Sequence, residues 1–459
     1  MSATYRSLTL GILAIISCSA FEALAVNTAM PVVAEELSAG AGYGLAFSMY
    51  FTTSLVGTVL AGSRCDAEGP RRVLAAGMVL MVAGLLVSAL AGAFWMVTAG
   101  RAVSGLGGGA LSVALYVVIG EIYPRALQPV IFGWLAAAWV LPSLIGPLVA
   151  GLLAQYVSWR WVFAGVIPLV LLAGAVVLPR IAPPGAARAA ADAPAPAGRA
   201  VWGTVLAAGV FAAQWAGVRT AVSGGQAVLP WILAIGGAIV AAVALVKLLP
   251  VGTLRLRRGL PSVIATRGLM NASFVAADSF LPLMLVSGHG VTPATAGLAL
   301  TAGAVGWALG SYLQARVPVR QHMLLVIGAS VLTAAIAGPS LLTSPSAPFG
   351  VVILVWSLAG LAMGTALPST SVMVLSLSSS ADRGRNSSSL HISDQVGGVV
   401  GTTAAGVLFA LLQPPAAGGG AQSFSVIWLA LSGFAALAIV AGARSAVSNS
   451  TTGKVQSSA

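Results

Sequence analysis

Residues 62–72 read Gly62-Ser63-Arg64-Cys65-Asp66-Ala67-Glu68-Gly69-Pro70-Arg71-Arg72, a short polar segment with five charged side chains. Apolar runs flank this segment, near 43–62 and 73–92. Each run has about the 20 residues that a helix needs to cross a bilayer. The segment therefore predicts a tight polar turn between two membrane-spanning helices.

The composition of the whole chain supports a membrane protein. Of 459 residues, 58% are hydrophobic and only 7% are charged, with a mean hydropathy of +0.98. Soluble domains carry about 25% charged residues, so the composition excludes a protein with an ordinary aqueous surface. Two cysteines, Cys18 and Cys65, are too few for a disulfide framework.

Apolar runs recur along the chain and predict an all-α polytopic membrane protein with fourteen spans. The spans lie near 8–31, 43–62, 73–92, 95–119, 129–153, 159–178, 201–219, 228–249, 262–286, 293–315, 322–342, 348–377, 389–412 and 424–443. The predicted parts are a six-span N-terminal half at 1–178, a cytoplasmic linker at 179–200, an inserted two-span hairpin at 201–249, a six-span C-terminal half at 250–443 and a cytoplasmic tail at 444–459.

The distribution of basic residues predicts the orientation in the membrane. If the N-terminus is cytoplasmic, 19 of the 22 Lys and Arg residues fall on the cytoplasmic side, the exceptions being Arg101, Arg160 and Arg219. This bias is the positive-inside rule. The net charge of +12 is thus interpreted as an orientation signal, and we expect no nucleic-acid partner.

Glycine positions suggest that the two six-span halves are duplicates. Gly57 and Gly310 occupy matching places in two spans at an offset of 253, and Gly105 matches Gly360 at an offset of 255. Repeated halves are typical of secondary transporters with a midplane site. The alternative is chance matching in a chain rich in Gly, Ala and Leu.

Ionisable residues inside the spans are the candidate functional groups, because each costs about 2.5–3.5 kcal/mol to insert. They are Glu22, Arg101, Asp278 and Asp394. A carboxylic acid in an apolar cavity can take up and release a proton, since its charged form loses solvation. We therefore predict that Glu22 and Asp278 couple transport to protons and that Arg101 modulates Glu22.

Each of these candidates also has a simpler structural interpretation. Glu22 and Arg101 could form a static buried pair. Asn271 and Ser273 could be hydrogen-bond neighbours of Asp278. Helix capping or interfacial solvation would explain Asp394.

Motifs of enzymes and ATPases fail in context. The string Gly105-x-Gly107-x-x-Ala110 fits a dinucleotide fingerprint, but it lies inside an apolar run, where small residues let helices approach closely. Three histidines provide no His-Glu-x-x-His site, and a Gly-x-x-x-x-Gly-Lys-Ser/Thr loop is absent from the sequence. We expect no metal, no cofactor and no enzymatic activity, although a membrane enzyme or receptor is the rival from another class.

The motifs resemble those of a known family. Residues 62–72 look like the Gly-x-x-x-Asp-x-x-Gly-x-Arg-Arg signature of the major facilitator superfamily. Residues 21–31, Phe21-Glu22-Ala23-Leu24-Ala25-Val26-Asn27-Thr28-Ala29-Met30-Pro31, are similar to a pattern of its fourteen-span drug:proton antiporters. Gly146-Pro147-x-x-Ala150-Gly151 resembles the antiporter motif, with Pro142 where that motif usually has glycine.

The resemblance implies the major facilitator fold and assigns further residues. A gating loop would comprise Gly62, Asp66, Gly69, Arg71, Arg72 and Glu121, and a helix bend would comprise Pro142, Gly146, Pro147 and Gly151. The alternative for the loop is a solvated turn that only sets orientation. We also expect Asn27 and Trp356 to line or modulate a cavity.

These observations predict a proton-coupled secondary transporter that exports lipophilic or drug-like solutes by alternating access. An exporter of a lipid, glycolipid or endogenous metabolite on the same fold is the alternative. We expect a monomer in the plasma (inner) membrane with both termini cytoplasmic. Its partners would be a small lipophilic solute, protons and the lipid bilayer.

Overall fold

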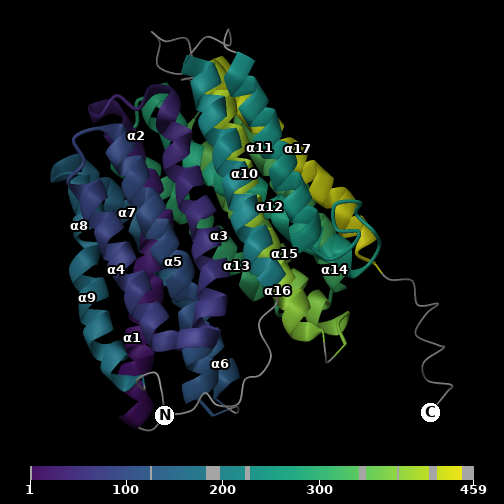
Figure 1. Cartoon of the computed structure of the whole chain (residues 1–459). Helices are drawn as coiled ribbons and strands as arrows, with labels where there is room; N and C mark the ends of the chain where they lie inside the picture. The colour runs from purple at the N-terminus through teal and green to yellow at the C-terminus, as the bar shows by residue number, and fades with distance from the viewer. Residues whose placement is uncertain are drawn as a thin grey trace.

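The computed structural model describes residues 3–124, 127–181, 197–222, 228–340, 348–379, 382–412 and 421–446, and the described residues form helices and their connections. Residues 447–459 of the predicted tail and most of the predicted linker at 179–200 lie outside these ranges. Figure 1 shows two bundles of long helices that touch at one end and diverge at the other.

The N-terminal bundle precedes residue 181. It comprises α1 (Ala3–Leu24), α2 (Val26–Glu36), η1 (Gly40–Gly42), α3 (Tyr43–Glu68), α4 (Pro70–Ala89), α5 (Phe94–Ile122), α6 (Gln128–Ala137), α7 (Val140–Tyr156), α8 (Arg160–Ala164), α9 (Val166–Val177) and η2 (Leu178–Arg180). We call the end of the molecule where α1 begins the near end, and the end where α2 finishes the far end.

A hairpin of two helices and a C-terminal bundle follow. The hairpin comprises α10 (Ala197–Val222) and α11 (Val228–Leu248). The C-terminal bundle comprises α12 (Leu260–Leu283), η3 (Met284–Gly288), α13 (Pro293–Gln314), α14 (Gln321–Ala337), η4 (Gly338–Ser340), α15 (Phe349–Ser376), α16 (Arg383–Leu412) and α17 (Ala421–Arg444).

The span count agrees with the sequence. Within the described residues, thirteen helical segments are long and apolar enough to cross a membrane. The fourteenth predicted span, 322–342, is α14, an apolar helix of 17 residues. Many outward-facing side chains of these helices are Leu, Val and Ile, which lipid solvates well.

Local sequence explains where several helices begin. Gly69 separates α3 from α4 with φ of 87°, a backbone conformation that favours glycine, and Pro70 then occupies the first turn of α4. The polar segment 62–72 is therefore mostly helical, and its connection is a single residue. Thr292 caps α13 by accepting a hydrogen bond of 3.2 Å from the Thr295 amide.

The fifth predicted span is interrupted earlier than the antiporter-like motif suggests. α6 ends at Ala137 and α7 begins at Val140, whereas α7 continues through Pro147. Pro142 has no N–H to donate to the carbonyl of Ala138, four residues earlier. The interruption thus follows from Pro142 and not from the Gly146-Pro147 pair.

The two bundles meet at the far end through very close backbone contacts. A Cβ added to Gly44 of α3 would lie 2.4 Å from the Cα of Gly406 in α16. A Cβ on Gly297 of α13 would lie 2.5 Å from the carbonyl oxygen of Pro147 in α7. Small residues at both crossings let helices of different bundles approach, while the helices of the two bundles lie farther apart at the near end (Figure 1).

Candidate functional site

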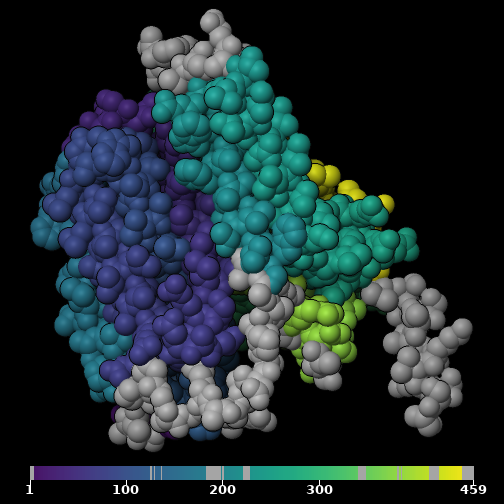
Figure 2. Space-filling model, viewed as in Figure 1, coloured from purple at the N-terminus to yellow at the C-terminus, as the bar shows by residue number. Residues whose placement is uncertain are grey.

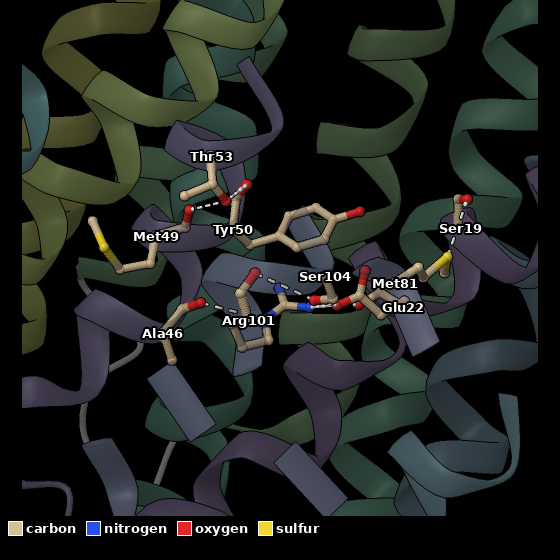
Figure 3. A network of polar contacts seen from close by, with 9 residues as sticks. All are labelled: Ser19, Glu22, Ala46, Met49, Tyr50, Thr53, Met81, Arg101 and Ser104. Atoms are coloured by element: carbon tan, nitrogen blue, oxygen red, sulfur yellow. Dashed lines mark hydrogen bonds and ion pairs between the residues drawn. The ribbon is translucent and has the colours of Figure 1, made fainter. Parts of the chain in front are cut away.

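A buried ion pair lies inside the N-terminal bundle. Glu22 on α1 and Arg101 on α5 are both fully buried, and the Nη1 of Arg101 lies 2.7 Å from the Oε1 of Glu22. Ser104, one turn along α5, donates a second hydrogen bond of 2.7 Å to the same oxygen (Figure 3). The two intramembrane charges predicted from the sequence are therefore direct partners.

The surroundings orient the guanidinium of Arg101. Its Nε donates to the carbonyl of Ala46 at 3.3 Å, and its Nη1 also donates to the carbonyl of Glu22 at 3.0 Å. The ring of Tyr50 lies 4.3 Å from the guanidinium carbon, a cation–π contact (Figure 3). The Glu22 Oε2 and Arg101 Nη2 have no hydrogen-bond partner among the described residues.

The hydrogen-bond network of this pair is incomplete. A buried pair is tolerated best when every donor and acceptor is satisfied. Here, within the described part of the chain, one carboxylate oxygen and one guanidinium nitrogen are buried without partners. The polar network of the pair is therefore not fully satisfied.

The second predicted carboxylate lies at the boundary between the bundles. Asp278 on α12 is 9% exposed and accepts a hydrogen bond of 2.7 Å from Asn27 on α2. The predicted alternative neighbours bond elsewhere. Asn271 donates to the carbonyl of Asp394, and Ser273 donates to the carbonyls of Leu269 and Leu431.

A further ion pair lies in the C-terminal bundle, and sequence reasoning missed it. Arg267 on α12 lies 3.1 Å from Asp394 on α16, and the two side chains are 17% and 21% exposed. Arg267 also donates to the hydroxyls of Thr370 and Ser371 on α15. Asp394 lies eleven residues inside α16, so the helix-capping interpretation of this residue is wrong.

The predicted gating residues lie at the near end, where the bundles diverge. Asp66 and Arg72 are exposed, and Arg71 is half-buried. Among the described residues, none of these three side chains forms an ion pair or a hydrogen bond. Glu121 ends α5 on the same side, and Gly62 has no neighbour within 4 Å of an added Cβ.

The predicted cavity residue Trp356 lies in packed core instead. It is 1% exposed and stacks on Phe274 at 5.2 Å between ring centroids. A Cβ added to Gly303 would lie 2.6 Å from the Cδ1 of Trp356. The prediction that Trp356 lines an open cavity is therefore wrong for this structure, because neighbouring helices fill the space around its ring.

The antiporter-like residues of α7 contact two different partners. A Cβ on Gly146 would lie 3.3 Å from Phe21 and Ala25, at the junction of α1 and α2. A Cβ on Gly151 would lie 2.7 Å from the backbone of Ala294 in α13. α7 thus packs against the first span and also closes the far end. Among the described residues, no group of three His, Cys, Asp or Glu side chains could hold a metal ion.

Comparison with known proteins places this geometry in a family. The model of the Major Facilitator Superfamily matches residues 12–277. A protein of Mycobacterium tuberculosis called a probable multidrug-efflux transporter is 25% identical over 429 residues, which cover 90% of this chain and 88% of that protein. An uncharacterized transporter of Schizosaccharomyces pombe is 33% identical over 160 residues, covering 33% of this chain and 26% of that protein.

Solved structures agree on the fold. The crystal structure of a POT family transporter in complex with 5-aminolevulinic acid superposes with a TM-score of 0.67 at 14% identity, covering 95% of this chain and 94% of that chain. A peptide transporter POT in complex with sulfate gives a TM-score of 0.64 at 15% identity, covering 94% and 93%. The chain belongs to the Major Facilitator Superfamily and is a multi-pass membrane transporter.

Proposed function

We propose that the protein is a proton-coupled antiporter that exports lipophilic or drug-like solutes across the plasma membrane by alternating access. The observation that carries the proposal is the buried pair of Glu22 and Arg101, with the Oε2 of Glu22 unpaired. Intramembrane carboxylates of this kind mark proton pathways. The name of the Mycobacterium tuberculosis relative, a probable multidrug-efflux transporter, supports efflux as the direction and drug-like solutes as the cargo.

The structure corresponds to one state of the proposed cycle. We place the near end in the cytoplasm, as the distribution of basic residues predicts, so that the described state is closed outside and open inside. The halves at 1–178 and 250–443 would rock about the central contacts. In the opposite state Asp66 would pair at the near end, in keeping with its lack of an ion pair to any residue that the structure describes.

The two carboxylates would have different tasks. Glu22 lies within one bundle beside a cation, so its proton exchange would be controlled by the position of Arg101. Asp278 has an amide and no cation among its described contacts, and it lies where the bundles meet. Proton uptake at Asp278 would therefore act directly on the contact between the bundles.

The test is proton release from acidified everted vesicles when a panel of lipophilic cations is added. Wild type should release protons, and Glu22→Gln should not, because glutamine keeps the size of the side chain but carries no titratable proton. Glu35→Gln is the matched control, since Glu35 is exposed at the end of α2 and its loss should leave the response unchanged.

Each outcome has a defined meaning. A normal response from folded Glu22→Gln would remove Glu22 from proton coupling. Silence of wild type with confirmed expression would reject lipophilic cations as cargo and direct the search to a lipid, glycolipid or endogenous metabolite.

A further inference from the structure

The hairpin covers the seam between the two bundles. In Figure 2 its teal surface overlies the boundary between the purple and blue N-terminal bundle and the green C-terminal bundle. α10 runs along this seam and contacts helices of both bundles. A Cβ on Gly203, near its start, would lie 2.6 Å from Val59 of α3, and one on Gly217, near its end, would lie 2.7 Å from Val407 of α16.

One buried polar side chain of α10 lies at this seam. Gln214 of α10 is 1% exposed. Its Nε2 donates hydrogen bonds to the hydroxyl of Thr403 on α16 and, at 3.5 Å, to the hydroxyl of Thr52 on α3. Buried polar groups need partners, and the partners of this amide belong to two different bundles.

The orientation of the Thr403 hydroxyl determines how Gln214 bonds to the C-terminal bundle. The hydroxyl of Thr403 donates to the carbonyl of Val399, one turn earlier in α16, at 2.6 Å. Its proton is thus directed away from α10, and its lone pairs accept from Gln214. Thr52 is itself 3% exposed, so water does not readily replace the amide there.

We infer that Gln214 is a positioning residue of the transport cycle, whose amide ties α3 to α16 and stabilises the state closed at the far end. The inference rests on the rocking of the two bundles in the proposed function, but not on the cargo or on proton coupling. It gives the hairpin a role that the sequence alone did not suggest.

The position of the Gln214 bridge along α3 and α16 makes it sensitive to opening of the far end. Thr52 and Thr403 are each nine residues from the far-end terminus of their helix, Tyr43 and Leu412, or about 14 Å along the axis. Opening the far end separates α3 from α16 at this depth. A hydrogen bond does not extend beyond about 3.5 Å, so the amide must release at least one helix.

The size of the effect follows from ordinary hydrogen bonds. A net contribution of about 0.5–1.5 kcal/mol per bond corresponds to roughly a two- to tenfold change in the ratio of the two states. Leucine is a suitable replacement because the Oε1 of Gln214 has no partner among the described residues. The substitution therefore removes the bridge and keeps apolar packing.

The experiment measures the distance between spin labels at the far end of the two bundles by pulsed electron paramagnetic resonance. The labels are attached at Glu35→Cys and Ser287→Cys, both exposed positions. Cys18 and Cys65, which are both buried, are first replaced by alanine. The protein is measured without cargo and without a proton gradient, so the result does not depend on the substrate or on coupling.

Matched variants test whether the effect comes from loss of the Gln214 bridge or from loss of any side-chain amide. Gln214→Leu should raise the ratio of open to closed populations about two- to tenfold, and Thr403→Val should shift it in the same direction. Gln314→Leu is the control, since Gln314 bonds to Gln321 within the C-terminal bundle, and it should match the parent.

Two results would overturn the inference. One is a Gln214→Leu distribution equal to that of the parent or of Gln314→Leu. If Gln214→Leu does not give a monodisperse protein, Thr403→Val decides, because this nearly isosteric change preserves packing. A Thr403→Val distribution equal to the parent would then reject the bridge.

Discussion

The amide of Asn27 donates a hydrogen bond of 2.7 Å to the Oδ2 of Asp278, and this bond joins α2 of one bundle to α12 of the other. Close by, the hydroxyl of Tyr43 donates to the carbonyl of Ser279 at 3.2 Å. A candidate proton carrier is thus part of the contact that closes the far end. The Asp278 carboxylate and the relative position of the two bundles are therefore linked through one hydrogen bond.

Asn27→Ala should weaken the closure of the far end. The substitution leaves the buried Asp278 without its amide donor, and hydrogen bonds to charged groups contribute about 1.5–3 kcal/mol. We expect the ratio of open to closed populations to rise by about one order of magnitude or more. The label pair at positions 35 and 287 measures this ratio.

Two further variants give this prediction its specificity. Asp278→Asn should retain closure of the far end, because the introduced amide carbonyl still accepts a hydrogen bond from Asn27. In this variant the distance distribution should not change with pH through position 278, because the amide carries no titratable proton. Ser48→Ala is the control, because the hydroxyl of Ser48 bonds only to backbone of its own helix. Equal distributions in Asn27→Ala and Ser48→Ala would contradict the prediction.

The pair of Arg267 and Asp394 should show a strong energetic coupling. Removal of one partner leaves the other largely buried and unpaired, which is costly. We expect a double-mutant cycle with Arg267→Leu and Asp394→Leu to give a coupling energy of about 1–3 kcal/mol. Unfolding in detergent, followed by circular dichroism, measures it.

An exposed ion pair at the start of α16 provides the comparison. Asp382 and Arg385 are 3.1 Å apart with side chains 42% and 63% exposed. A surface pair contributes little, so the matching cycle with Asp382→Leu and Arg385→Leu should give a coupling near zero. Equal coupling in both cycles would show that burial does not control the strength of the first pair.

Sequence reasoning succeeded where hydropathy carries the information. Long apolar runs separated by polar turns define the spans. Because few charged residues interrupt these runs, the sequence identifies Glu22 and Arg101 as candidate functional residues. The direct contact of these two residues was considered only as the structural alternative. Their shared neighbours Ser104 and Tyr50 carry no charge, so nothing in the sequence separated them from ordinary helix residues.

Other contacts were missed for different physical reasons. Arg267 belongs to the basic residues that predict the orientation, and the span predicted at 389–412 places Asp394 close to a helix start, where a cap is expected. α16 in fact begins at Arg383, which carries Asp394 into the bundle. Gln214 is a neutral amide whose partners are 162 and 189 residues away, and a single sequence contains no signal for that pairing.

Glu36 should give the protein a defined loss of stability in acid. Its carboxylate accepts hydrogen bonds from Arg160 at 2.8 Å and from Trp159 at 2.7 Å, and these donors hold the pKa of Glu36 below its ordinary value. A lowered folded-state pKa means that the contribution is present above the unfolded pKa of about 4.3 and is lost as the pH falls through the folded pKa.

The measurement compares thermal unfolding of wild type and Glu36→Gln across pH. Wild type should be the more stable of the two near pH 7, and the difference should shrink below about pH 4.3. Glu35→Gln, at the neighbouring exposed position, should show no such trend. A difference between wild type and Glu36→Gln that stays constant with pH would contradict this account.

Three glycines of α3 should respond differently to alanine, because they face different surroundings. A Cβ on Gly44 would lie 2.4 Å from the Cα of Gly406 in the other bundle, whereas one on Gly57 would lie 2.2 Å from the carbonyl oxygen of Leu106 in the same bundle. Around Gly62 there is nothing within 4 Å. In the proposed cycle, the first contact would exist only while the far end is closed, whereas the second, inside one bundle, would persist in every state.

Gly44→Ala should therefore shift the labelled population towards the open far end and leave thermal stability close to that of wild type, since opening relieves the clash. Gly57→Ala should lower the unfolding temperature without favouring either state, because α3 and α5 must separate to admit the methyl group. Gly62→Ala should keep the populations unchanged and stabilise the helix slightly, by up to about 1 kcal/mol. Loss of thermal stability in Gly44→Ala, with an unchanged distance distribution, would show that the contact between Gly44 and Gly406 is rigid core and that the bundles do not separate there during transport.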